Sequence, residues 1–572
     1  MARPVLNPSR KFRFNAVVGA LALCSGGAGA VEIDTGNPDL KVRLDTTVRY
    51  NLGTRVESPD ARILASTSYD ESDAKFGRGD IVTNRFDLLS ELDIGYKQMF
   101  GARISAAAWY DAAYRDHGVR SPGGNGLVPT SYFDNTYNNK VKRFVNGPSA
   151  EFLDAFIWSN FNLGPVPVNV KLGRHTLVWG EGLLIGGHAI SYGQAPSDGV
   201  KAVASPGIET KEVFLPLNQL SFKAQVTGDL SVMGQYFLEW KPTRVPNSGT
   251  YLMGADTSPN VDRLGITTGF AAPRVDNLEP GNTGNWGLGL RWDVAAIEST
   301  VGFYYRKFNE YNPETGIQFM SFTQLVPGNA ATTVPSSFRF VYPTNTKLIG
   351  VSLSRSVGPV SVGMDLSLRQ NAHLNSVSSY TSPLINTGAK GDTLHAVVNG
   401  LYLLPKTALW DTGNVIVELA YSRLQKITAG ENLYRGEGYV GCTKPTGAPA
   451  TDVADRGYTC STKDFLQMAV NFAPQWIQLA PSWDLTLPIS VNAGLKGTAP
   501  TGGGGFEKLV SYSIGAVATY SAKHEFSLRY SDLTVPGKYH TTTGALIGGN
   551  SLGSSLGATD RGWIVATYKT SF

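Results

Sequence analysis

The chain ends on residues 563–572, Trp563-Ile564-Val565-Ala566-Thr567-Tyr568-Lys569-Thr570-Ser571-Phe572, where apolar and polar side chains alternate up to the last residue. Successive side chains of a strand point to opposite faces, so Ile564, Tyr568 and Phe572 share one face. This alternation predicts a β-strand that includes the terminal residue. Such a strand needs a partner, because a free edge is a row of unpaired backbone polar groups.

The same period of two recurs along the chain. From Val42 to Leu52, mostly apolar side chains at even positions alternate with polar ones at odd positions, and the pattern returns in residues 86–96, 102–110, 297–306, 362–369, 415–422 and 525–530. A soluble β-sandwich also alternates. However, segments of about ten residues suit a tilted membrane crossing, whereas strands of globular proteins usually have about five or six residues. Many apolar faces also end in Tyr, Phe or Trp, as expected at the two bilayer interfaces.

Residues 1–30 are predicted to be a signal peptide. Arg3, Arg10, Lys11 and Arg13 precede an apolar run and the small residues Ala28-Gly29-Ala30, so the mature chain is expected to begin at Val31 after export by the general secretory pathway. These four residues are the only charges in the segment, and without them the formal net charge falls from +4 to 0. Nucleic-acid binding, which requires a clustered basic face, is therefore not indicated.

Together these features predict an all-β fold: a single transmembrane antiparallel β-barrel spanning residues 31–572, with about 14 to 18 strands. Short connections such as 97–101 and long polar ones such as 118–147 fit periplasmic turns and outer loops. In a barrel the last strand must pair with the first, because lipid offers no hydrogen-bond partner to a free edge. The expected location is the outer membrane of a Gram-negative bacterium, with lipid and lipopolysaccharide as surroundings. Tyr568 and Phe572 are expected to form the signal read by the barrel-assembly machinery.

Chemistry-bearing residues give little sign of an active site. Cys442 and Cys460 share one long loop and are predicted to form a disulfide, which export permits. The histidines are scattered without metal-ligand spacing, and the glycine run 502–505 lacks the Lys that a phosphate-binding loop requires. We therefore expect no metal, no cofactor and no enzymatic activity.

Residues 151–256 contain the least regular stretch, with an insert predicted at about residues 179–216. A long non-strand insert either enters the lumen or caps a mouth of the barrel; a solvated outer loop is the alternative. If it enters the lumen, its charges need partners or water. The candidates for a lumenal ion-pair network beside the conduction path are Arg174, Glu181, Glu209, Lys211 and Glu239, with Trp179 nearby.

Short motifs in this region resemble one known family. Trp179-Gly180-Glu181, Pro206-Gly207 with Lys211-Glu212 and Pro216, and Glu239-Trp240-Lys241-Pro242-Thr243-Arg244 with Gly249-Thr250-Tyr251 and Asp256 look like the domain of unknown function 1302 family of proteobacterial outer-membrane proteins. A Ser is expected where this chain has Gly182. The family has no settled activity. The resemblance implies passage of hydrophobic or aromatic molecules across the outer membrane.

The leading functional hypothesis is therefore a channel or transporter for hydrophobic or amphipathic small molecules, driven by a gradient or by a periplasmic partner. Selectivity would come from inward-facing residues of mixed charge, which argue against a simple anion or cation pore: Arg43, Asp45, Arg49, Arg85, Asp87, Glu91 and Asp93. A structural or adhesive barrel with a plugged lumen is the second hypothesis, and an outer-membrane hydrolase is the third.

Overall fold

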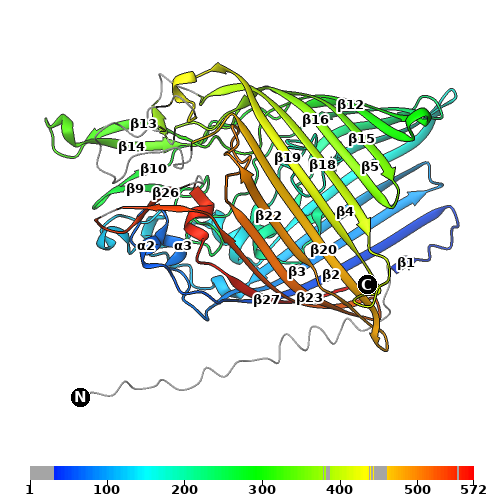
Figure 1. The fold of residues 1–572 in the computed structure, drawn as a ribbon, viewed down its shortest axis with the longest axis horizontal. Coiled ribbons are helices and arrows are strands. Elements are labelled where there is room, and N and C mark those ends of the chain that lie inside the picture. Colours follow the sequence, from blue (N-terminus) through cyan, green and yellow to red (C-terminus); the bar gives the residue numbers. More distant parts are fainter. Residues whose placement is uncertain are drawn as a thin grey trace.

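The computed structural model describes residues 31–377, 379–381, 387–436, 439, 442, 460–540, 542–549 and 553–572. In this part the chain forms a closed antiparallel barrel of 18 strands with few helices (Figure 1), which confirms the predicted fold class. The predicted signal peptide lies outside the described residues. No helix in the described ranges has both the length and the apolar character needed to cross a bilayer.

The wall strands follow one another around the barrel in chain order. They are β2 (Leu40–Arg55), β3 (Ile81–Tyr96), β4 (Phe100–Asp111), β5 (Ser149–Leu163), β6 (Val166–His175), β7 (Leu217–Gln225), β8 (Leu230–Phe237), β11 (Trp286–Val294), β12 (Ser299–Phe308), β15 (Thr346–Val357), β16 (Val360–His373), β18 (Lys390–Leu403), β19 (Thr412–Ala429), β20 (Asp464–Ala480), β21 (Trp483–Thr486) with β22 (Ile489–Lys496), β23 (Val510–Tyr520), β24 (His524–Thr534) and β27 (Trp563–Ser571). β21 and β22 both pair with β20 and β23 and form one crossing, interrupted near Pro488, whose nitrogen cannot donate to the ladder.

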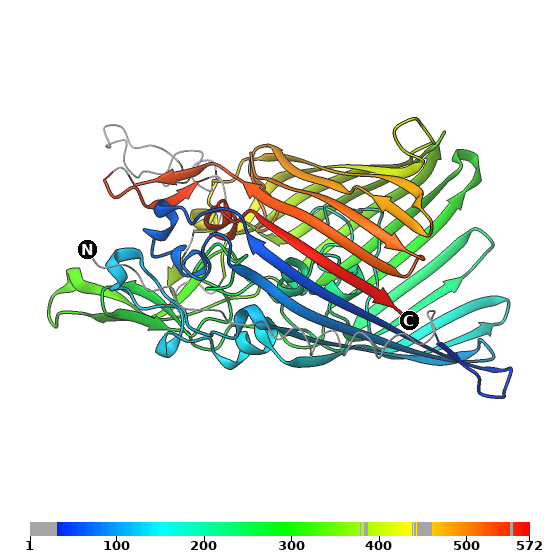
Figure 2. The same cartoon turned by 90° about the horizontal axis from the view of Figure 1, so that it is seen from below.

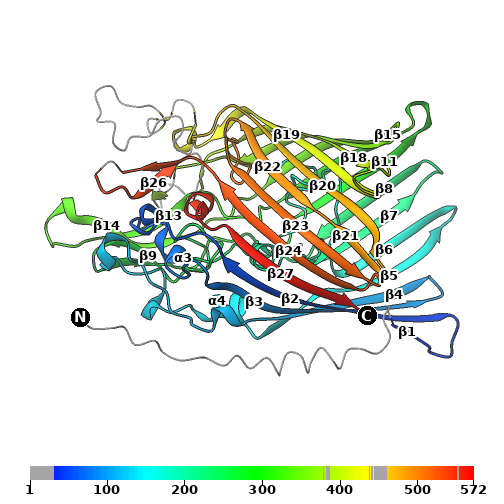
Figure 3. The same cartoon turned by 60° about the horizontal axis from the view of Figure 1, so that its bottom comes forward.

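The barrel closes between its last and first long strands. β27 pairs with β2 from Trp563 opposite Arg55 to Ser571 opposite Thr47, and the two strands lie side by side in Figure 3. Phe572 extends the ladder, because its N–H donates to Thr46 O (2.9 Å) and Thr46 N–H donates to Phe572 O (2.7 Å). The short strand β1 (Val31–Ile33) pairs with β2 beyond this point. Among the described strands, the closed wall therefore leaves no free edge for lipid to meet.

The two faces of the wall differ as the alternation predicts. Outward-facing side chains such as Ile514, Phe526 and Leu528 are exposed, Leu528 by 55%. Their inward neighbours are polar, including Ser513 and Arg529. An apolar outer band around a polar interior is the pattern of a barrel surrounded by lipid.

The connections separate by length. Short turns lie at the barrel end that holds the C-terminus, and the long connections gather at the opposite end, which we call the mouth (Figure 1). The elements between wall strands are β9 (Arg263–Thr267), β10 (Phe270–Pro273), β13 (Ile317–Gln324), β14 (Thr333–Arg339), β17 (Ser379–Thr381), β25 (Gly537–Tyr539), β26 (Leu546–Gly549), α2 (Ala61–Leu64), α3 (Asp70–Asp73), α4 (Asn139–Val141), α5 (Gly199–Ala204), α6 (Thr210–Val213), η1 (Ala112–Tyr114), η2 (Gly123–Gly126), η3 (Phe133–Asn135), η4 (Lys142–Asn146), η5 (Ala295–Ile297), η6 (Ala330–Thr332), η7 (Glu431–Leu433) and η9 (Gly553–Ala558).

The mouth loops pack on one another around an aromatic core. Tyr132, Tyr137, Tyr251 and Phe338 are each nearly fully buried there, and Phe76 meets Tyr114 and Tyr251 edge to face. Because these residues come from connections far apart in sequence, the mouth has its own folded layer above the wall.

The structure is more regular between residues 151 and 256 than the sequence pattern suggests. β5, β6, β7 and β8 continue the wall through this stretch, and its two long non-strand parts are residues 176–216 and the connection that follows β8 from residue 238. The alternation is obscured at a register shift between β4 and β5, opposite Ile104 and Ala106. One extra residue in a strand reverses the face of every side chain that follows it.

Candidate functional site

Residues 176–216, called the insert below, leave the wall at the end of β6 and lie inside the barrel (Figure 2). The insert begins at the Trp179-Gly180-Glu181 motif, where Asp365 on β16 accepts hydrogen bonds from Glu181 N–H (2.8 Å), Gly182 N–H (3.3 Å) and Ile190 N–H (3.0 Å). Gly180 has φ +89°, and a Cβ there would lie 2.6 Å from the Asp365 carboxylate. Only glycine fits this turn without displacing the carboxylate that holds it.

A second wall carboxylate holds the next residues. Glu418 on β19 is fully buried and accepts from the N–H groups of Leu183 (2.6 Å), Leu184 (2.9 Å) and Ile185 (2.5 Å). A buried carboxylate needs several donors in place of water, and three successive backbone N–H groups supply them. Glu418 therefore fixes the path of the chain across this side of the lumen.

Two wall arginines hold the carbonyl groups that follow. Arg369 on β16 donates to Gly187 O (2.9 Å) and Ala189 O (3.1 Å). Arg306 on β12 donates to the carbonyls of Ile190, Tyr192 and Gly193 at 2.6 to 3.0 Å. Acidic wall residues thus bind the N–H groups of the insert and basic wall residues bind its carbonyls, which satisfies its backbone away from water.

A histidine pair closes this first half of the insert. His188 donates from Nε2 to Gly504 O (2.7 Å), and its Nδ1 lies 2.9 Å from Nδ1 of His395 on β18. Burial and the nearby Arg369 guanidinium lower the pKa of His188 to about 4, so its ring is neutral at neutral pH. The neutral ring accepts the proton of His395 Nδ1, and His395 Nε2 accepts from the Thr393 hydroxyl (2.8 Å).

The second half of the insert lies against the opposite wall, on β2, β3 and β27. Arg49 on β2 pairs with Glu212 (2.6 Å), and Asp87 on β3 accepts from Ser205 Oγ (2.8 Å) and pairs with Arg85 (2.9 Å). All of these side chains are buried. The structure therefore brings Arg49, Arg85 and Asp87 together, as anchors of the insert rather than as groups lining an open path.

Glu91, Glu209 and Lys211 lie in the adjoining part of this network. Lys211 pairs with Glu91 on β3 and with Glu209 (3.0 Å), while Glu209 also pairs with Lys569 on β27 (3.0 Å). Glu91 is held from its other side by Arg103 (2.5 Å). Mixed charges on the inner face thus neutralise one another across the insert and the wall.

The remaining predicted inward residues lie elsewhere on that face. Arg43 and Asp45 pair with each other (2.9 Å) near the C-terminal end of the barrel, and Asp93 lies 3.7 Å from Arg103. On the opposite wall, Trp179 stacks on Tyr304 with 5.9 Å between ring centroids, and Glu181 lies 3.5 Å from Arg291. Asp93 reaches the network of Glu209 and Lys211 through Arg103 and Glu91, whereas Arg43, Asp45, Trp179 and Glu181 make no ion pair or hydrogen bond with it in the described ranges.

The structure places Arg174 and Glu239 away from the lumenal network. Arg174 lies opposite Ala155 on β5, and Ala155 lies opposite Ile104 on β4. Ile104 is exposed on the outward face of the wall, so Arg174 also faces outward. Its guanidinium lies 3.7 Å from Glu239, which also pairs with Lys241. The cause is strand parity: Gly173 faces inward, and the next residue faces outward.

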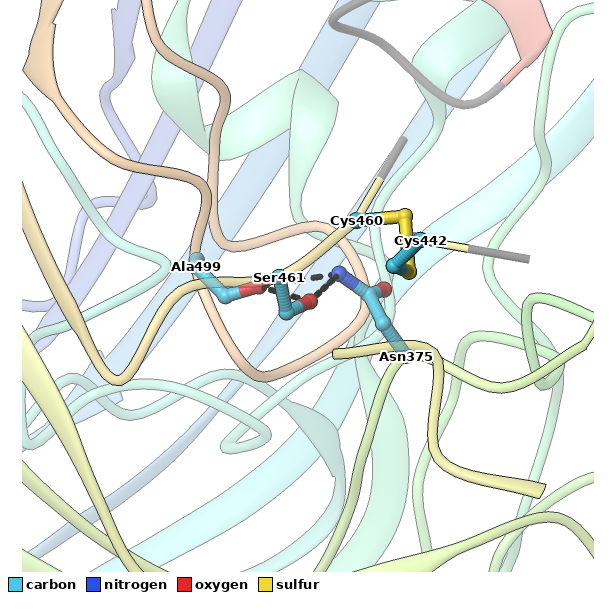
Figure 4. Close-up of a disulfide and its surroundings, with 5 residues drawn as sticks. All are labelled: Asn375, Cys442, Cys460, Ser461 and Ala499. Carbon is cyan, nitrogen blue, oxygen red and sulfur yellow. Dashed lines mark hydrogen bonds between the residues drawn. A yellow bond between two sulfur atoms is a disulfide. The ribbon is translucent and has the colours of Figure 1, made fainter. Parts of the chain in front are cut away.

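Cys442 and Cys460 form a disulfide (Figure 4). Beside it, Asn375 Nδ2 donates to Ser461 Oγ (2.8 Å) and Ala499 O (2.9 Å), so the loops after β16, before β20 and after β22 meet at this point. The disulfide belongs to the mouth and is remote from the insert anchors on β2 and β3.

The insert leaves one side of the lumen uncovered. Between its α5 and Pro206 and the strands β22, β23 and β24 lies a cavity of about 340 Å³. Its strand side carries inward polar residues that are half-buried or exposed: Ser490, Asn492, Ser511, Ser513, Arg529 and Ser531. On β2, β3, β16, β18 and β19, by contrast, the inward residues Arg49, Asp87, Asp365, His395 and Glu418 are all buried.

Sequence reasoning missed the wall residues that hold the insert and those that line the cavity. Asp365 and Glu418 are acidic residues between uncharged neighbours on the inward faces of β16 and β19, which is the signal that would single them out. Arg306 and Arg369 carry the same signal with opposite charge. Arg529 has no local feature that separates it from other inward arginines, because its role depends on where the insert lies.

Two solved structures are similar over nearly the whole chain. One is a BenF-like porin from Pseudomonas fluorescens Pf-5, with 11% identity and a TM-score of 0.39, covering 95% of this chain and 100% of that chain. The other is OccAB1 of Acinetobacter baumannii, with 10% identity and a TM-score of 0.39, covering 93% of this chain and 96% of that chain. With TM-scores this low, neither similarity bears on the path or on the substrate.

No curated protein matches the sequence. The family described as protein of unknown function (DUF1302) matches residues 11–572, which include the insert, the strands that hold it and the terminal Phe572. The chain therefore belongs to the DUF1302 family.

Proposed function

We propose that the protein is an outer-membrane channel that passes hydrophobic or amphipathic small molecules between the insert and β22, β23 and β24. The observation that carries this proposal is the asymmetry of the lumen. The wall residues Arg49, Asp87, Asp365, His395 and Glu418, which contact the insert, are buried, whereas the inward residues of β22, β23 and β24 keep contact with solvent and border the 340 Å³ cavity. A cavity of this size is in the range that accommodates small organic molecules.

The lining supports an amphipathic rather than a strongly charged solute. The insert side contributes Ala202, Val203 and Pro206, and Leu252 and Trp563 continue the apolar surface. The strand side is lined mostly by hydroxyl and amide groups. Polar groups in such a lining orient a solute, while the apolar surface favours its body over bulk water.

The proposal includes energy from a solute gradient or from a periplasmic transport partner, and it assigns no catalytic step to the protein. The insert is held by wall contacts on both sides, so the solute moves past a fixed constriction.

The test is the single-channel conductance of refolded residues 31–572 in a planar bilayer, with and without amphipathic solutes. We expect discrete steps. Ser513→Trp fills the cavity side of β23 and should lower the conductance by about half or more. Ala516→Trp is the matched control, because it places the same side chain on the outward face of the same strand.

Silence from demonstrably folded wild-type protein would contradict the channel and favour a plugged structural or adhesive barrel. Equal conductance in Ser513→Trp and wild type would place the conducting path outside this cavity and overturn the proposed route.

A further inference from the structure

Arg529 on β24 differs from the other inward arginines of the wall. Arg49, Arg85 and Arg103 pair with carboxylates, and Arg306 and Arg369 donate to insert carbonyls. In the described part of the chain, the Arg529 guanidinium has neither an ion-pair partner nor a hydrogen bond, although it is half-buried. A guanidinium has five N–H donors and retains its charge. Because the Arg529 donors have no partner among the described residues, they are available to bind a ligand.

The other charged residues that border the cavity are already engaged. The Asp532 carboxylate accepts from the hydroxyls of Tyr512 (3.1 Å) and Tyr530 (3.3 Å). Arg561 is buried and donates to the carbonyls of Tyr251 (2.7 Å) and Met253 (2.6 Å). Glu525 faces inward from the same strand as Arg529 but makes no ion pair with it in the described residues. Arg529 is thus the charge that the cavity offers to a solute.

The groups around Arg529 add direction to that charge. Ser513 and Ser531 lie on the same side of the cavity and supply hydroxyl groups, while Val203, Pro206 and Trp563 form the facing apolar surface. A molecule with one polar end and an apolar body fits both surfaces at once. A neutral apolar molecule would leave the guanidinium without an acceptor, which is unfavourable for a partly desolvated charge.

We propose that Arg529 makes the channel selective for amphipathic organic acids, by binding the carboxylate while the apolar body lies against the insert. This inference rests on the proposed channel function and narrows its substrate class. Paired N–H donors of arginine match the two oxygens of a carboxylate, which adds orientation to the attraction.

The test compares two water-soluble probes that differ only at the polar end: 4-phenylbutyrate and its neutral amide, 4-phenylbutanamide. Equilibrium dialysis measures their binding to the refolded mature chain in detergent micelles, after subtraction of protein-free micelles. Wild type should prefer the acid by roughly tenfold or more, the value of one charge-assisted contact. Arg529→Gln should bring the two probes to equal binding, and Arg529→Lys should keep part of the preference.

Lys223→Gln is the matched control. It removes one positive charge from the inward face of β7, where Lys223 borders a different cavity. Retention of the acid preference in this variant, with its loss in Arg529→Gln, supports the inference. An equal loss in both variants would assign the preference to the general lumenal field, and an undiminished preference in Arg529→Gln would exclude Arg529; either result overturns the inference.

The bilayer conductance of the same preparations separates this inference from the function on which it rests. If the wild-type protein conducts but binds the acid and the amide equally, the proposed channel function stands and the proposed selectivity is wrong. If it neither conducts nor binds either probe, both the channel function and the selectivity are wrong. Migration of each variant as a folded barrel on unboiled gels ensures that a loss of binding reflects the site.

Discussion

At the scale of single residues, Glu418 is the side chain whose removal should most weaken the insert. It accepts from three consecutive N–H groups inside a fully buried site. Glu418→Ala leaves these donors without a partner, which costs about 1–3 kcal/mol for each buried group that water does not reach. We expect hydrogen exchange at Leu183, Leu184 and Ile185 to become about tenfold faster or more.

Glu525→Ala serves as the control for this substitution. Glu525 also faces inward, but it lies on β24, on the side of the lumen that the insert leaves open. Exchange at residues 183–185 should be the same in this variant as in wild type. Slow exchange in Glu418→Ala would mean that the other anchors, chiefly Asp365 and Arg369, hold the segment without Glu418.

A second single residue, Glu71 in α3, should make the mouth loops sensitive to pH. Its carboxyl is buried and accepts from Ser131 N–H (2.5 Å) and Ser248 Oγ (2.7 Å). Burial raises the pKa of Glu71 from 4.5 to about 7, against the lowering effect of these hydrogen bonds. The folded loops therefore bind a proton that the unfolded chain releases. Their stability is fully present below pH 4.5 and decreases by about 3 kcal/mol as the pH rises through 7.

We expect the near-ultraviolet circular dichroism of the mouth, where Tyr132, Tyr137 and Tyr251 pack, to be lost at a temperature several degrees lower at pH 8 than at pH 5. Glu71→Gln mimics the protonated side chain and should reduce this difference. Burial also raises the pKa of Asp256, so part of the pH dependence should remain in this variant. Asp134→Asn, at an exposed position of the same mouth, should leave the difference unchanged. An equal difference in Glu71→Gln and wild type would contradict the assignment.

At the scale of elements, the sequence predicts strands better than it predicts the paths between them. The alternation around Val42 and Phe86 is a local property, and inward facing of Arg49, Asp87 and Glu91 follows from it directly. The path of residues 176–216 depends on Asp365, Glu418 and other wall residues more than 170 positions away. A local pattern contains no information on such contacts. Arg174 is a smaller example of the same problem, because an error of one residue in the strand alternation moves its side chain from one face of the wall to the other.

The loop closed by Cys442 and Cys460 is an element whose constraint can be removed without touching the wall. The bond joins residues 18 positions apart, and its reduction should lower the stability of the folded loop by about 3 kcal/mol, because the open chain gains conformational entropy when unfolded. Asn375 still ties Ser461 to Ala499 beside it, so the effect should stay local. We expect a reductant to speed proteolysis between the two cysteines while the barrel remains folded on unboiled gels.

The double variant Cys442→Ala and Cys460→Ala separates this effect from other actions of the reductant. Its proteolysis should be fast from the start and unchanged by reduction. Reduced wild type that unfolds entirely would show that the disulfide stabilises the wall as well as the loop.

At the scale of the whole molecule, closure depends on a strand that ends with the chain. Phe572 joins the ladder through its backbone, which donates to and accepts from Thr46. Any residue except proline can make those two hydrogen bonds at this position. If the aromatic side chain is needed for recognition during assembly, Phe572→Ala should reduce the amount of barrel in the outer membrane several-fold in cells. The same variant, refolded from denaturant into detergent, should reach the folded state as well as wild type.

Tyr568→Ala distinguishes recognition from stability in this experiment. Tyr568 packs on Phe526 with 5.1 Å between ring centroids, and its hydroxyl lies 2.9 Å from His524 Nδ1, so its side chain joins β27 to β24. Its loss should lower both the yield in cells and the stability of the refolded barrel, because an aromatic cross-strand pair contributes about 0.2–1 kcal/mol and burial adds to it. If Phe572→Ala also refolds poorly in detergent, the Phe572 side chain stabilises the barrel as Tyr568 does, and a role in recognition is not supported. If Phe572→Ala reaches normal amounts in the membrane, its side chain is not needed for assembly, and closure requires only the backbone that pairs with Thr46.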